Sequence, residues 1–358
     1  MKKQELPKII QHTIQEGTVI PAIPLALNSR RKYDEKRQQA LVRYYLDAGA
    51  GGIAIGVHTT QFEIRDPRYG LFEPVLSTVS RMIDQHAVKR SLTPVKIGGI
   101  CGRTDEALQE GEFLRNHGFH AGLLSLSAFA DDPLETMIDH CQKVAEVLPL
   151  FGFYLQPSVG GRILPYEFWR KFAEIENVIG IKIAPFNRYQ TFDVVRAVCD
   201  AGRKGEIALY TGNDDAIVMD LLTEYQIHTS SHEIGKVRIA GGLLGQWSVW
   251  TQKAVELYRK VRKISLSDAS IPQEFLTLAH ELTDANGAIF DAAHGFKGCI
   301  PGIHEILRRQ GFLEGTWCLN PEECLSPGQT QEIDRIYRSY PELTDDEFVA
   351  QHIDEWLL

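Results

Sequence analysis

Near the middle of the chain lies Asn177-Val178-Ile179-Gly180-Ile181-Lys182-Ile183-Ala184-Pro185, an apolar run that contains a single lysine. A short and nearly continuous apolar run is typical of a strand buried on both faces in a parallel sheet. Burial disfavours the charged form of a lysine, so more of Lys182 is expected to be the neutral, nucleophilic amine. Such an amine can attack a carbonyl group and form a Schiff base. The alternative is a lysine at the end of a strand whose amine reaches water.

This run belongs to a regular alternation of short apolar segments and helical-period segments between about residues 18 and 260. Eight such alternations favour a (β/α)8 TIM barrel over an open doubly wound sheet. No Gly-x-Gly-x-x-Gly motif opens the first helix, which counts against a dinucleotide-binding half. The expected strands are 18–27, 52–56, 95–100, 121–125, 151–155, 178–183, 207–211 and 237–244, and the helices between them include 34–48, 104–117, 133–147, 166–175, 189–201 and 214–225.

Beyond residue 250 the pattern becomes helical, and we expect two parts in the chain. Residues 1–250 are predicted to form the barrel domain, and residues 251–358 a C-terminal helical appendage that packs on the barrel. The appendage has no catalytic spacing but is suited to a subunit interface. Its expected helices are 251–263, 272–286, 303–309, 329–337 and 345–357.

Composition narrows the classes of partner and compartment. The net charge of −9 argues against nucleic acid or an anionic membrane as the main partner. The six cysteines are scattered without a C-x-x-C pair, which favours reduced thiols over a disulfide framework. The N-terminus lacks the apolar core of a signal peptide, and no stretch of about 18 apolar residues occurs. We therefore expect a cytoplasmic protein.

The strand before the lysine offers a second reactive group. In a TIM barrel the chemistry lies at the carboxyl ends of the strands. Side chains alternate along a strand, so Gly180 and Lys182 share one face, as Gly152 and Tyr154 do on the preceding strand. Because neighbouring strands lie about 4.8 Å apart, the Tyr154 hydroxyl is expected to converge on the Lys182 amine and to carry protons. The alternative is a core aromatic residue with a satisfied hydroxyl.

Four motifs in this order resemble the dihydrodipicolinate synthase / N-acetylneuraminate lyase superfamily. The sequence Tyr154-Leu155-Gln156-Pro157, followed by Gly180-Ile181-Lys182, is similar to the family's Tyr-Asn-x-Pro and Gly-Ile-Lys. The stretch Gly56-Val57-His58-Thr59-Thr60-Gln61-Phe62-Glu63 corresponds to its Gly-Thr-Thr-Gly-Glu loop, and Tyr210-Thr211-Gly212-Asn213-Asp214-Asp215 resembles its Gly-x-Asp-(Asp/Glu) loop. These matches cover about residues 15 to 250, so the chain resembles a divergent member with a C-terminal helical extension.

The resemblance implies a class I lyase that acts on pyruvate or another 2-oxo acid. Lys182 would form the imine, Tyr154 would move protons, and Thr59 and Thr60 would bind the substrate carboxylate through hydroxyls and backbone amides. Gly212, Asp214 and Asp215 would lie in the loop that contacts substrate hydroxyls in the lyase-like members; for the two aspartates the alternative is helix N-terminal capping. The imine with Lys182 would leave no need for a metal or another cofactor. A homo-oligomer, a dimer or a tetramer, is also implied.

Departures from the family pattern bear on the reaction. His58 and Gln61 replace both glycines of the threonine loop, and residues 127–133 lack the tyrosine that synthases extend into a neighbouring subunit's site. Val159 occupies the slot of the synthases' arginine, and Arg162 follows three residues later. These departures favour a pyruvate-type aldolase or a keto-deoxy sugar acid aldolase or dehydratase.

Three alternatives stay open beside that interpretation. One is the condensation catalysed by dihydrodipicolinate synthase, and another is a non-catalytic barrel that binds a 2-oxo acid. The third is a metal-dependent aldolase, which the lack of ligand spacing disfavours, since none of the His-Glu pairs forms H-E-x-x-H. Those pairs are His232-Glu233, His280-Glu281 and His304-Glu305.

Overall fold

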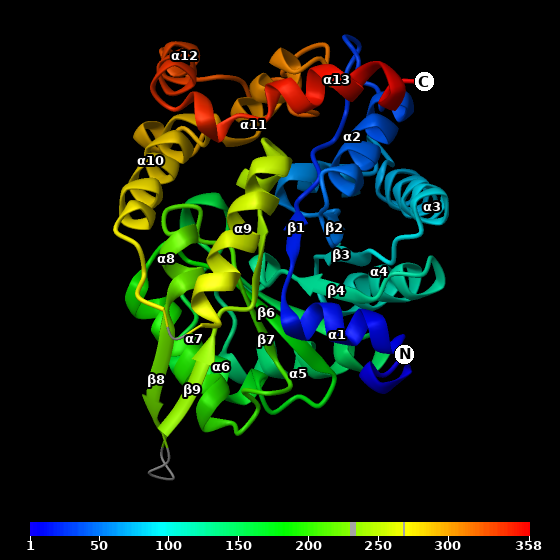
Figure 1. Ribbon diagram of the computed structural model, residues 1–358. Coiled ribbons are helices and arrows are strands. Elements are labelled where there is room, and N and C mark those ends of the chain that lie inside the picture. The colour runs from blue at the N-terminus through cyan, green and yellow to red at the C-terminus, as the bar shows by residue number, and fades with distance from the viewer. Residues whose placement is uncertain (230–233, 268) are drawn as a thin grey trace. The chain divides into compact units, whose positions relative to one another are not determined.

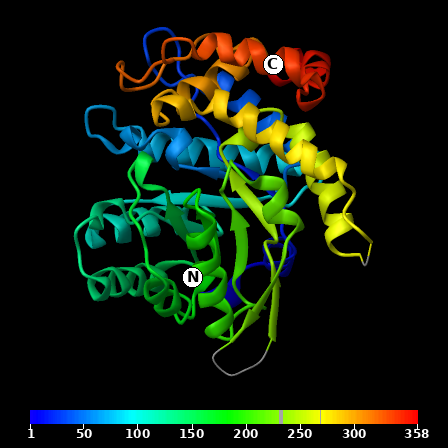
Figure 2. The same ribbon diagram turned by 90° about the vertical axis from the view of Figure 1, so that its left-hand side faces the viewer.

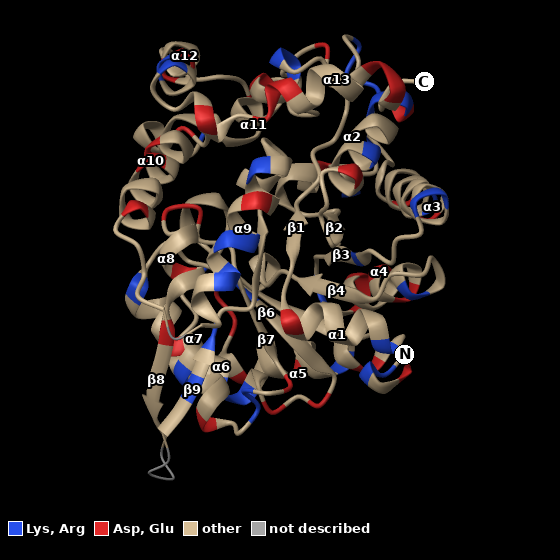
Figure 3. Ribbon diagram, viewed as in Figure 1, with Lys and Arg blue, Asp and Glu red and all other residues tan. Residues whose placement is uncertain are grey.

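The computed structural model describes residues 1–229, 234–267 and 269–358. Its parallel strands follow the order β1-β10-β7-β6-β5-β4-β3-β2, with helices between successive strands (Figure 1). This is the nearly closed sheet of a TIM barrel, followed by C-terminal helices, so the predicted fold class is confirmed. Lysine, arginine, aspartate and glutamate residues lie mainly on the helices and loops (Figure 3). The chain divides into two compact units, which are described in turn.

The first unit comprises residues 1–18, 95–243 and 261–271 and contains the strand with the lysine. Each residue of its strands β3 to β7 is buried, which explains why these segments are apolar on both faces. The strands are β3 (Val95–Ile100), β4 (Ala121–Leu124), β5 (Leu150–Leu155), β6 (Val178–Ala184), β7 (Ala208–Thr211) and β10 (Gly241–Leu244). The helices are α1 (Lys8–Glu16), α4 (Thr104–Asn116), α5 (Leu134–Val147), α6 (Tyr166–Phe172), α7 (Arg188–Asp200) and α8 (Ile217–Leu222).

The segment before the last barrel strand differs from its prediction. It forms an antiparallel hairpin of β8 (Glu224–His228) and β9 (Ile234–Arg238), so the barrel strand β10 is shorter than the expected 237–244 (Figure 2). Ion pairs from Glu224 to Lys236 (3.3 Å) and Arg238 (3.2 Å) join the two strands, which explains the polar composition of the segment. The pair His232-Glu233 lies outside the described residues. Helix α1 was not among the predicted elements.

The second unit comprises residues 19–94, 244–260 and 272–358. Its strands β1 (Val19–Pro21) and β2 (Gly52–Ile55) are neighbours, and a parallel bridge joins Ala22 to Ala54. Helix α3 was not predicted. The helices are α2 (Glu35–Asp47), α3 (Phe72–Arg90), α9 (Thr251–Ser265, whose last turn belongs to the first unit), α10 (Glu274–Ile289), α11 (Cys299–Arg309), α12 (Gln329–Ser339) and α13 (Asp346–Trp356).

Helix α2 packs against the C-terminal helices through a buried tyrosine. The Tyr44 ring lies 4.7 Å from that of Phe312 and 5.4 Å from that of Trp356, measured between centroids. Its hydroxyl donates a hydrogen bond to Asp345 (2.6 Å) and accepts one from the backbone N–H of Thr251 (2.7 Å). The C-terminal helices are therefore part of the same core as α2. The domain boundary expected at residue 250 stays a prediction.

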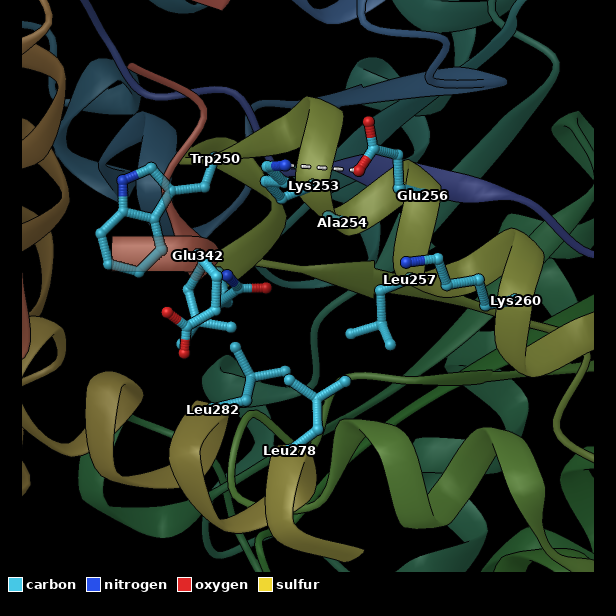
Figure 4. Close-up of a pocket in the computed structure, with 11 residues that line it drawn as sticks. Trp250, Lys253, Ala254, Glu256, Leu257, Lys260, Leu278, Leu282 and Glu342 are labelled. Carbon is cyan, nitrogen blue, oxygen red and sulfur yellow. Dashed lines mark ion pairs between the residues drawn. The ribbon is translucent and has the colours of Figure 1, made fainter. Parts of the chain in front are cut away.

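A pocket of about 300 Å³ opens between α9, α10 and the turn Pro341–Leu343 (Figure 4). Leu257 of α9 and the pair Leu278 and Leu282 of α10 line it with apolar surface, while charged side chains such as Lys260 also border it. Among the described residues, no helix is both long and apolar enough to cross a membrane.

Replacing Tyr44 by phenylalanine tests the packing on α2. The substitution keeps the ring but leaves the Thr251 N–H unpaired and removes a donor to Asp345, so we expect a loss of about 1.5–3 kcal/mol in the free energy of unfolding. Urea denaturation measures this loss. Tyr189→Phe is the matched control, because Tyr189 is 86% exposed and its replacement should change stability very little. A Tyr44→Phe variant as stable as the control would contradict the assignment.

Candidate active site

Lys182 lies near the carboxyl end of β6 and is 7% exposed. In the ladder it is paired with Phe153 of β5 and with Tyr210 of β7. Paired residues of a parallel sheet point to the same face, so these three side chains share one face. The Lys182 amine lies 4.4 Å from the centroid of the Phe153 ring, within the range of a cation–π contact. The predicted buried strand with an inward lysine is therefore what the structure contains.

Two glycines make room beside this lysine. A Cβ atom at Gly212 would lie 2.7 Å from Cε of Lys182 and 2.7 Å from Cβ of Ala184. A Cβ atom at Gly180 would lie 2.5 Å from the Phe151 ring. Gly212, predicted to belong to the substrate loop, is thus brought directly against the Lys182 side chain. Any larger residue there would have to displace the lysine.

Tyr154 does not lie beside Lys182, and the expected convergence of the two groups is wrong. It is paired with Ile183, one position further along β6, and therefore lies on the opposite face of the sheet. The ring packs 5.2 Å from that of Trp169 in α6, and the hydroxyl accepts a hydrogen bond from the Leu164 N–H (3.2 Å). Burial raises the pKa of Tyr154 to about 12. The reason for the error is register, which pairs Phe153 rather than Tyr154 with the lysine.

A buried polar network joins the carboxyl ends of β6 and β7. Asn213 accepts a hydrogen bond from the N–H of Phe186 (3.0 Å) and donates one to Asp220 (3.0 Å). Asp220 is fully buried in α8 and also accepts from the Thr211 hydroxyl (2.6 Å) and from Arg188. Phe186 has a left-handed φ of 52°, so the Asn213 contact stabilises a strained turn directly after the strand of the lysine.

Sequence reasoning missed the members of this network. Asn213 lies in the motif Tyr210-Thr211-Gly212-Asn213-Asp214-Asp215 but was not predicted as a site residue. Asp220 had a readable signal, because it is the single charge in the apolar helix Ile217–Leu222. A charge in such a segment is buried only when it is paired.

The predicted residues Asp214 and Asp215 follow this network in the loop before α8. Asp214 is half-buried and Asp215 is exposed. The N-cap residue of α8 is Ala216, so neither aspartate occupies that position.

In the second unit, Thr59 and Thr60 are buried at the end of β2. Thr59 donates a hydrogen bond from its hydroxyl to the carbonyl of Ala22 (2.7 Å), and Thr60 donates to that of Ile23 (2.8 Å). The Thr60 hydroxyl also accepts from the N–H of Gly56 (3.1 Å). Both hydroxyl protons are engaged, and the N–H of Thr60 donates to the carbonyl of Val57 (3.0 Å), so a carboxylate at this loop would be bound after rotation of a hydroxyl.

His58 and Gln61, which replace the two glycines of the family's loop, differ in backbone conformation. Gln61 has a φ of 69°, in the half of the map that suits glycine, and a non-glycine residue there carries about 1–2 kcal/mol of strain. His58 is half-buried, with its ring 5.9 Å from that of Phe62. Within the described residues, no group of three or more His, Cys, Asp and Glu side chains is placed to hold a metal ion.

A barrel with a buried lysine near the carboxyl end of a strand has the arrangement typical of class I, Schiff-base enzymes. The model of the dihydrodipicolinate synthetase family matches residues 15–225, which is more than half of the chain. The chain therefore belongs to this family, and the predicted resemblance is confirmed.

Individual relatives agree with this assignment. The chain is 30% identical over 127 residues to a 4-hydroxy-tetrahydrodipicolinate synthase of Alkaliphilus oremlandii, covering 35% of this chain and 42% of that protein. The first two curated relatives are matched over 42% and 66% of their length. Dihydrodipicolinate synthase from Oceanobacillus iheyensis has a similar fold, with a TM-score of 0.71, 17% identity and coverage of 93% and 99% of the two chains. N-acetylneuraminate lyase from Fusobacterium nucleatum complexed with pyruvate also has a similar fold. Its TM-score is 0.67, its sequence identity is 15%, and the match covers 92% of this chain and 98% of that chain.

The network around Asp220 gives a stability prediction for this end of the barrel. Replacing Asp220 by asparagine removes the charge that pairs with Arg188. It also replaces one accepting oxygen by an NH2 group, which cannot accept the hydrogen bonds that Asp220 now receives from its neighbours. We expect a loss of about 1.5–3 kcal/mol in the free energy of unfolding, measured by urea denaturation. Asp193→Asn is the control, since its half-exposed pair with Arg196 should contribute about 0–1 kcal/mol. Equal losses in the two variants would contradict the described network.

Proposed function

We propose that the chain is a class I lyase that forms a Schiff base between Lys182 and a 2-oxo acid such as pyruvate. The observation that carries the proposal is the position of Lys182, buried near the end of β6 with Gly212 against its side chain. Membership in the dihydrodipicolinate synthetase family supports it.

The chemistry needs a neutral amine and a carbonyl carbon. The Lys182 nitrogen attacks C2 of the 2-oxo acid, and the resulting carbinolamine loses water to give a protonated imine. In the cleavage direction the electron pair of the C3–C4 bond moves toward the iminium nitrogen while a base takes the proton of the C4 hydroxyl. An aldehyde leaves, the enamine is protonated at C3, and water releases pyruvate from the lysine. The protonated imine thus acts as the electron sink, so the step uses no separate cofactor.

Several features favour a sugar-acid aldolase or dehydratase as the specific activity. The loop of Gly212, Asp214 and Asp215 offers carboxylates suited to substrate hydroxyls. Arg162 donates to the carbonyls of Phe129 (2.6 Å) and Asp132 (3.1 Å) and is engaged by the loop after β4. An arginine committed to that loop is a poor substitute for the arginine of the synthases.

The remaining family-based assignments are part of the proposal. Thr59 and Thr60 are proposed to bind the substrate carboxylate, with rotation of their hydroxyls supplying donors. Tyr154 is no longer proposed as the proton carrier, because its hydroxyl faces α6. A dimeric or tetrameric homo-oligomer and a cytoplasmic location stay predictions.

Synthase-type condensation is the second candidate, because the curated relatives are named as 4-hydroxy-tetrahydrodipicolinate synthases. Both reactions begin with the same imine, so product analysis separates them. A non-catalytic barrel would bind or trap pyruvate without turnover, and a metal-dependent aldolase would form no imine at all.

Reductive trapping tests the imine. Incubation with pyruvate and borohydride should give a covalent adduct that mass spectrometry assigns to Lys182. Gly212→Ala should slow adduct formation about tenfold or more, because its Cβ atom would displace the lysine side chain. Gly205→Ala is the matched control, since a Cβ atom at Gly205 meets nothing within 4 Å. An adduct on another lysine, or none, would refute the proposal for pyruvate.

The Tyr154 hydroxyl gives a separate prediction. Because it faces Leu164 and α6 rather than Lys182, Tyr154→Phe should trap pyruvate at a rate within about twofold of wild type. The lost hydrogen bond should lower the free energy of unfolding by about 0.5–1.5 kcal/mol. Trapping kinetics and urea denaturation measure the two effects. A trapping rate reduced tenfold or more would show that the hydroxyl acts in imine formation.

A further inference from the structure

The threonine loop ends on a residue in an unusual backbone conformation. The turn His58–Thr60 is followed by Gln61, which has φ 69° and ψ 119° and is completely buried. The resembling motif has a glycine at this place, which adopts positive φ without steric cost. A glutamine there must be held by contacts of its own.

The contact that holds Gln61 comes from the C-terminal part of the chain. Its side-chain oxygen accepts a hydrogen bond from the backbone N–H of Leu319 (2.5 Å). The carbonyl of the same Leu319 accepts from the Tyr69 hydroxyl (3.0 Å), so both backbone polar groups of this residue are bound by the segment that follows Thr60. Leu319 and Cys318 are buried, and Arg31 donates to the carbonyl of Cys318.

A second set of bonds fixes the beginning of the same C-terminal segment. Arg37 of α2 donates to the carbonyls of Gly311 (2.9 Å) and Phe312 (2.8 Å) and forms an ion pair with Glu314 (3.0 Å). Residues 311–319, here named the C-terminal clamp, are therefore attached at one end to α2 and at the other to the loop around Gln61.

We infer that the C-terminal clamp positions the Thr59–Thr60 loop and that Gln61 is the positioning residue through which it acts. Thr60 directly precedes Gln61, and its hydroxyl is held between Gly56 and Ile23, so a shift at Gln61 is transmitted to the threonines. The clamp, which lies far away in the sequence, holds Gln61 in its positive-φ conformation. A glycine at this position would adopt that conformation without such a contact. The effect on substrate affinity rests on the proposed role of this loop as the carboxylate ligand.

Three variants test this inference with pyruvate and borohydride as the probe. Gln61→Ala keeps the strained φ and removes the tether, so the half-saturating pyruvate concentration for trapping at Lys182 should rise about tenfold, while the maximal trapping rate stays within about twofold. Gln61→Gly removes the tether but also the strain, so the half-saturating concentration should return to within about threefold of wild type. Tyr69→Phe releases only the carbonyl of Leu319, so the half-saturating pyruvate concentration should rise about two- to threefold.

The pattern separates positioning from direct binding. If Gln61 touched the substrate, Gln61→Gly would be at least as impaired as Gln61→Ala, and that result would overturn the inference. An unchanged half-saturating pyruvate concentration in Gln61→Ala would overturn the inference as well. Gln39→Ala, the same change at a partly buried site of α2, is the control and should match wild type in all readouts.

Hydrogen–deuterium exchange of residues 56–64 measures, without any substrate, whether the hydrogen bond between Gln61 and Leu319 holds the loop in place. Exchange should be faster in Gln61→Ala than in wild type and largely restored in Gln61→Gly. Equal exchange in wild type and Gln61→Ala would overturn the inference. A wild-type protein that forms no adduct would instead refute the proposed function, while the exchange measurement would still decide whether the clamp holds the loop.

Discussion

The pairing register of β5, β6 and β7 is the constraint on which the proposed chemistry depends. It places Phe153, Lys182 and Tyr210 on one face of the sheet and Tyr154 on the other. The same face is occupied by Gly180, and Gly212 follows β7 at the level of the lysine stem. A slip of one residue would turn Lys182 toward the helices and Ile183 toward the amine's present position. The position of the Lys182 side chain thus depends on the register as much as on the residue type.

Two further sets of interactions hold the ends of the strands in place. In the first unit, Asp220 and Asn213 join the turn after β6 to the loop after β7 and stabilise the strained Phe186. In the second unit, the hydroxyls of Thr59 and Thr60 hold the loop after β2 to the end of β1, and the C-terminal clamp reaches the same loop through Gln61. The C-terminal part of the chain therefore contacts the loop after β2, as well as the core around Tyr44.

The barrel could be predicted from the sequence because fully buried parallel strands leave a strong local signal. The run from Val178 to Ala184 is apolar throughout except for Lys182, and the structure begins and ends β6 within a residue of the expectation. The hairpin Glu224–Arg238 could not be recognised in the same way, since its alternating polar residues resemble an irregular connection. Cross-strand ion pairs join its two strands, and only the pairing reveals them.

The buried position of Lys182 was predictable from the sequence, but the geometry around it was not. The spacing of Tyr154 and Lys182 matched the family, yet spacing alone does not determine register, and the irregularity between Leu150 and Phe151 changes which residue of β5 faces the lysine. The partners of Gln61 were equally hidden, because Leu319 lies far away in the sequence. Long-range contacts of this kind leave no local pattern to read.

The most direct test of the central claim is a crystal structure of the protein soaked with pyruvate. We predict continuous electron density from Nζ of Lys182 to C2 of pyruvate, with the Tyr154 hydroxyl still bonded to the Leu164 N–H. Pyruvate bound without a covalent link to Lys182, or joined to a different lysine, would contradict the account.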